Sequence, residues 1–97
     1  MINNEHTGFF LECMAEARHN LNVRESIAKL FQHFRAAIID QLNEQKAFKH
    51  LGEPQKKILA SMIIAMHEGV ELQWFADPDE VSLKDSLNFT KKLMTKI

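Results

Sequence analysis

The stretch EGVELQWFADPDEVSL, residues 68–83, decides how the second half of the chain folds. It follows residues 58–66, which are apolar apart from one serine, and it introduces a glycine and a tryptophan before the helical pattern stops. A proline at position 78 disfavours the α conformation of Asp77, the residue before it. The stretch therefore predicts that one helix ends before Pro78 and that a new helix starts at Ser82, which can cap it.

The composition of the whole chain is that of a soluble globular domain. Its 97 residues predict one domain, residues 1–97, and its 45% hydrophobic and 26% charged residues are ordinary values. No apolar run reaches the roughly 18 residues of a membrane span. The N-terminal residues MINNEHTG lack the features of a secretory signal. Cys13 has no second cysteine to pair with and is expected to be a small core residue. A cytoplasmic protein without a membrane partner is expected.

Helical periodicity is the pattern that recurs along the chain, and alternating strand patterns do not occur. The expected helices are about residues 5–19, 23–47 and 54–75, followed by a fourth from Ser82. Asn22, with Glu25 three residues later, has the spacing of a capping box for the second helix. All-α with four helices is therefore the predicted fold class.

The third expected helix is apolar on more sides than one chain can cover. Its apolar residues include Ile58, Ile64 and Leu72, which point in different directions at 100° per residue. A helix of this kind is buried on most sides. A second copy of the chain is the simplest cover, because two-fold dimers are the commonest soluble oligomers. Gly69 in mid-helix is then explained by the close approach of another backbone or ring, since glycine weakens a helix.

Two long segments carry a resemblance to a known family. The segment ILASMIIAMHEGVELQWFADPDEVSLKDSLNFTKKLM resembles the last two helices of TetR-type transcriptional regulators, including the break at Asp77-Pro78. Upstream, FFLECMAEARHNLNVRESIAKLFQHFRAAIIDQL is similar to the preceding helix pair. The family usually has Asp-Gly where this chain has Glu68-Gly69. The resemblance covers most of the chain, and no segment of this sequence corresponds to the family's helix-turn-helix head.

The resemblance implies a function as well as a fold. It implies the carboxy-terminal ligand-sensing and dimerisation domain of a bacterial repressor, with the DNA-binding head absent from this chain. The last two helices of each subunit would form an intermolecular four-helix bundle in a homodimer. The parent protein would bind operator DNA, whereas this chain itself would make no DNA contact. A small apolar effector is the other implied partner, and the sequence does not identify it.

Two sets of candidate site residues follow. The effector-pocket candidates, which the resemblance places in the regulatory core and which ordinary core packing also explains, are Phe10, Met14, Phe31, Phe34, Met62 and Met66. The dimer-interface candidates, which combine the excess apolar surface with the resemblance, are Ile63, Gly69, Val70, Trp74, Leu87, Phe89 and Met94.

Catalysis and metal binding find little support in the sequence. His67 and Glu71 are four residues apart on one helix face, but two ligands do not make a metal site, and HEGVE lacks the second histidine of the H-E-x-x-H motif. No catalytic triad spacing or glycine-rich phosphate loop is recognisable. We therefore expect no enzyme activity, no cofactor and no metal. A stand-alone helical homodimeric interaction module without a small ligand remains the alternative reading.

Overall fold

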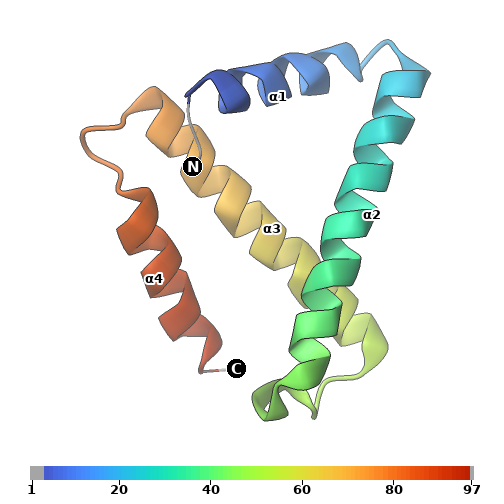
Figure 1. Ribbon diagram of the computed structural model, residues 1–97, viewed down its shortest axis with the longest axis vertical. Coiled ribbons are helices and arrows are strands. Elements are labelled where there is room, and N and C mark those ends of the chain that lie inside the picture. Colours follow the sequence, from blue (N-terminus) through green and yellow to red (C-terminus); the bar gives the residue numbers. More distant parts are fainter. Residues whose placement is uncertain (1–3, 97) are drawn as a thin grey trace. The chain divides into compact units, whose positions relative to one another are not determined.

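The computed structural model describes residues 4–96, and within that range the chain contains helices and no strand (Figure 1). The elements are α1 (Asn4–Glu16), α2 (Leu21–Glu44), the short 3₁₀ helix η1 (Lys46–Phe48), α3 (Glu53–Ala76) and α4 (Leu83–Met94). The all-α class and the four α-helices predicted from periodicity are confirmed. The chain forms two compact units, which meet between Phe34 and Arg35 inside α2.

The start of α2 differs from the expected one. The side-chain Oδ1 of Asn20 accepts hydrogen bonds from the backbone N–H groups of Asn22, at 3.0 Å, and Val23, at 3.2 Å. Asn20 is therefore the residue that caps α2. The prediction that Asn22 caps this helix is wrong, because Asn22 already lies inside its first turn.

The end of α2 also differs from the prediction. The helix stops at Glu44 instead of continuing to about Ala47, and a 3₁₀ turn follows. The turn directs Phe48 into the interior, where only 3% of it is exposed. Burying an aromatic side chain of this size contributes about 1.5–3 kcal/mol, more than the extra helical residues would contribute.

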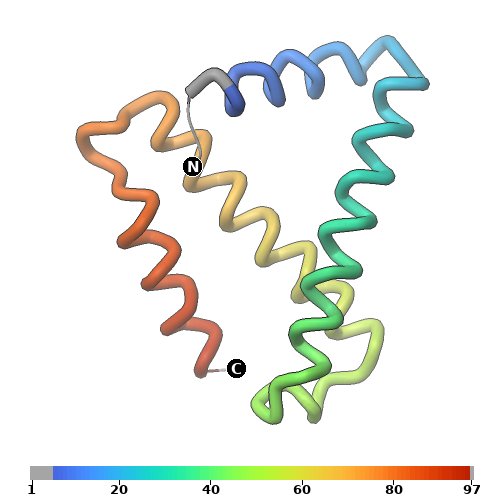
Figure 2. The backbone as a smooth tube through the Cα atoms, viewed as in Figure 1, coloured from blue at the N-terminus to red at the C-terminus, as the bar shows by residue number. Residues whose placement is uncertain are grey.

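The hairpin of α3 and α4 matches the expectation from residues 68–83. The backbone N–H of Asp77 donates to the carbonyl oxygen of Gln73 at 2.8 Å, which closes the last turn of α3. Ser82 Oγ then accepts the backbone N–H of Asp85 at 3.1 Å and caps α4. After this break α4 runs back along α3 in the opposite direction (Figure 2). The proline break and the serine cap are both confirmed.

The second unit has a small core at the end where α3 begins. Leu42, Phe48 and Leu59 are buried against one another. The partly buried side chains packed against this cluster are Ile38, Leu51, Ile63 and Met94. Because Met94 is the last residue of α4, the carboxyl end of α4 lies beside the amino-terminal half of α3.

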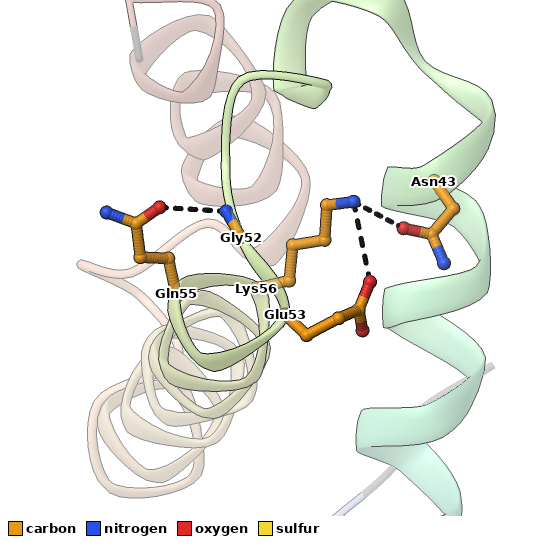
Figure 3. A network of polar contacts seen from close by, with 5 residues as sticks. All are labelled: Asn43, Gly52, Glu53, Gln55 and Lys56. Carbon is orange, nitrogen blue, oxygen red and sulfur yellow. Dashed lines mark hydrogen bonds and ion pairs between the residues drawn. The ribbon is translucent and has the colours of Figure 1, made fainter.

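A polar network fixes the first turn of α3 to the end of α2 (Figure 3). The Lys56 ammonium donates to Asn43 Oδ1 at 2.6 Å and lies 3.7 Å from Glu53 Oε1. The Gln55 side-chain oxygen accepts the backbone N–H of Gly52 at 2.9 Å, which satisfies a donor at the helix start. Lys56 is 9% exposed, and these partners provide the polar contacts that a buried amino group needs.

The first unit is built around a contact between α1 and α2. The rings of Phe10 and Phe31 meet edge to face with centroids 6.1 Å apart. Thr7 is buried within α1, and Ala17 is buried directly after the helix ends. Cys13 is only partly buried, whereas the sequence predicted a core residue.

Candidate functional site

A groove of about 630 Å³ runs between α3 and α4 and opens widely to solvent. Its walls come from residues 65–73 of α3 and residues 85–90 of α4. The lining residues are Ala65, Met66, Gly69, Val70 and Gln73 from α3 and Asp85, Ser86, Phe89 and Thr90 from α4. Small-molecule sites usually bury about 70–90% of their ligand, so this open shape suits an extended partner surface better than a small ligand.

Gly69 is open within its own chain. A Cβ atom built at Gly69 would meet nothing within 4 Å outside the local helix. The packing of α4 on α3 therefore does not require a glycine here. A glycine in mid-helix lowers the stability of the helix, and the fold of the single chain does not explain why one is present. The close-approach explanation of Gly69 remains a prediction, and any group that approaches it would have to come from outside the described chain.

Large apolar side chains on both helices of the hairpin stay exposed in the free chain. On α4, Phe89 is 61% exposed and Leu93 is 51% exposed. On α3, Ile58 is 62% exposed and Met62 is 56% exposed, and Leu72 and Phe75 are also exposed. Large exposed apolar surface commonly marks an interaction site. The excess of apolar surface on the third helix, read from the sequence, is therefore present in the structure.

The seven interface candidates divide into three groups. Gly69, Val70 and Phe89 line the groove. Ile63 and Met94 pack against the core of their own chain. Trp74 and Leu87 are partly buried on the hairpin. Sequence reasoning missed the groove-lining residues Ala65, Gln73, Asp85, Ser86 and Thr90, because small and polar residues between helices carry no apolar periodicity.

The six effector-pocket candidates do not form one described cavity. Phe10 and Phe31 contact each other in the first unit, where Met14 and Phe34 are each 41% exposed. Met66 lines the α3–α4 groove, while Met62 is exposed on α3. The role of these residues in effector binding remains a prediction.

His67 and Glu71 form a local pair on α3. His67 Nε2 lies 3.2 Å from Glu71 Oε1, and the glutamate side chain is 13% exposed. Among residues 4–96, no group of three or more metal-ligating side chains comes together. The pair is therefore a local polar contact, with no third metal-ligating side chain beside it in the described part of the chain.

Within residues 4–96, no helix is both long enough and apolar enough to cross a bilayer.

The order of the helices, the break at Asp77-Pro78 and the apolar hairpin at the carboxyl end are features of a TetR-type regulatory domain. Residues 1–96 match the family described as BetI-type transcriptional repressor, C-terminal, and the chain belongs to that family. Comparisons with curated proteins and with solved structures found no significant match.

Proposed function

We propose that this chain is the ligand-sensing and dimerisation domain of a TetR-type repressor, and that it dimerises through α3 and α4. Regulators of this family generally act as dimers on DNA. The observation that carries the proposal is the match over residues 1–96 together with the apolar hairpin that the free chain leaves uncovered. The proposed location is the cytoplasm, where such regulators meet DNA.

Dimerisation is supported by the size and position of the exposed apolar side chains. Phe89 and Leu93 on α4, and Ile58 and Met62 on α3, expose half or more of their surface. Burial of apolar surface contributes about 25 cal/mol per Å². Both helices of the hairpin carry such residues, so pairing two hairpins would give the four-helix arrangement that small bundles favour.

Effector sensing is supported by family membership and by the aromatic contact in the first unit. Phe10 and Phe31 place two rings edge to face at 6.1 Å, and Met14 on α1 is exposed. Aromatic rings and methionine side chains are suited to an apolar ligand, because methionine adapts to irregular shapes. The effector class that fits this chemistry is a small, largely apolar molecule.

Direct DNA binding is not part of the proposed role of this chain. Its net charge is −1, and Lys56, one member of the Lys56-Lys57 pair, is occupied by Asn43 and Glu53. Phosphate contacts by lysine and arginine supply most non-specific affinity for DNA. In regulators of this family, operator binding is proposed to be the role of the DNA-binding head.

Sedimentation equilibrium and a thermal-shift screen together test the proposal. The expected results are a dimer at micromolar concentration and a raised melting temperature with at least one apolar compound, since a ligand of the native state stabilises it. Phe31→Ala should abolish that ligand shift, whereas Leu21→Ala, an exposed position on the same helix, should retain it. A dimer with no ligand response would favour the alternative, a homodimeric interaction module without an effector.

A further inference from the structure

We propose that Phe89 of one chain seats over Gly69 of a second copy, and that this pairing sets the register of the dimer. The inference rests on the proposed dimerisation through α3 and α4 and adds the contact that determines how the two hairpins align. Gly69 has open space where a Cβ would stand, and Phe89 leaves 61% of its surface exposed at the same groove. One hairpin therefore carries both a recess and a projecting side chain.

Self-complementarity identifies the occupant as a second copy of this chain. In a two-fold interface, each contact between a residue of one subunit and a residue of the other occurs twice. A recess at Gly69 and a projection at Phe89 on the same surface satisfy this requirement without a third molecule. A small ligand would be left largely exposed in so open a groove.

Charge complementarity fixes the direction of the partner helix. Within one chain, α4 runs antiparallel to α3, so Lys91 and Lys92 lie toward the end of α3 that carries Lys56 and Lys57. A two-fold axis perpendicular to the helix axes reverses the helices of the partner, so the partner's α4 runs parallel to α3. Its basic carboxyl end then meets the end of α3 that is followed by acidic residues.

The register follows from the Phe89–Gly69 contact. Two parallel helices rise by the same distance per residue. The residue three positions after Phe89 in the partner's α4 therefore lies at the same height as the residue three positions after Gly69 in α3. Lys92 then reaches the level of Leu72, and since α4 ends two residues later at Met94, its basic end lies toward the carboxyl end of α3 at Ala76. The exposed carboxylates next along the chain are Asp77, Asp79 and Glu80. Opposite charges placed in this way favour one alignment over shifted ones.

Mixing two complementary variants tests the contact between chains. Gly69→Leu fills the recess and Phe89→Ala removes the projection, so each homodimer is weakened. A mixed dimer has two such contacts. In the first, the leucine at position 69 of one chain faces the alanine at position 89 of the other. In the second, Gly69 faces Phe89, as in the parent dimer. We expect labelled Gly69→Leu chain to bind Phe89→Ala chain about tenfold or more tightly than it binds the parent chain, as coupled residues in contact do. Asn88→Ala, a matched change beside Phe89, should behave like the parent.

The outcomes separate this inference from the proposed function. A parent chain that sediments as a monomer overturns both. A dimeric parent with equal affinity of the Gly69→Leu chain for the Phe89→Ala and parent chains overturns the pairing alone. Gly69→Ala, which own-chain packing accommodates, replaces Gly69→Leu if circular dichroism shows that the Gly69→Leu chain does not fold.

Discussion

Lys56 of α3 donates a 2.6 Å hydrogen bond to Asn43 of α2, and this contact joins two helices that are separated by a turn and a loop. Phe48, in the 3₁₀ turn between these helices, is buried against Leu42 of α2 and Leu59 of α3. The start of α3 is thereby held in place, and α3 in turn presents the groove that the proposed dimer uses.

Replacing Lys56 should weaken the fold. Lys56→Ala removes the hydrogen bond to Asn43 and the buried aliphatic stem, and hydrogen bonds of charged groups contribute about 1.5–3 kcal/mol. We expect the free energy of unfolding to fall by about 2 kcal/mol in urea denaturation. Lys57→Ala, at an exposed neighbouring position, is the control and should change it little. Equal effects of the two substitutions would contradict the role given to Lys56.

The two asparagines before α2 should differ in their contribution to stability. Asn20 accepts two backbone N–H groups, whereas Asn22 lies in the first helical turn. Asn20→Ala should cost about 1 kcal/mol of unfolding free energy, the usual effect of losing a cap, while Asn22→Ala should change it by a few tenths. Urea denaturation of both variants gives the comparison. A larger loss for Asn22→Ala would show that the helix starts later.

The chain by itself should not recognise DNA. No recognition helix or basic surface was found in the sequence, and the net charge is −1. A gel-shift titration at physiological salt should give no sequence-selective complex with duplex DNA that carries an operator of a TetR-type regulator. Selective binding at sub-micromolar concentration, absent with scrambled DNA, would contradict this expectation.

Much of the secondary structure could be predicted from the sequence because its signals are local. Asp77-Pro78 stops α3, and Ser82 caps α4, by interactions that span four residues or fewer. The cap of α2 was assigned wrongly because HNLN offers two asparagines, and the choice depends on where α1 ends. The turn at Lys46–Phe48 was missed for a related reason: the burial of Phe48 depends on α3, which lies further along the chain.

The candidate site was predictable only in part. The groove residues Gly69, Val70 and Phe89 were named from the sequence, since a mid-helix glycine and surplus apolar residues are visible there. Ile63 and Met94 were named by the same periodicity, yet they pack into their own chain's core. Periodicity identifies apolar faces but does not tell which face meets a distant segment and which meets another molecule.

The most direct measurement of the central claim is sedimentation equilibrium of the parent chain and of Val70→Glu. Val70 lines the α3–α4 groove, and a carboxylate placed there without a partner would cost several kcal/mol when a second chain covers it. The account predicts a dimeric parent at micromolar concentration and a folded Val70→Glu chain that is mainly monomeric. Lys57→Glu, an exposed change on the same helix, should stay dimeric. A monomeric parent, or a Val70→Glu chain that dimerises as tightly as the parent, would contradict the account.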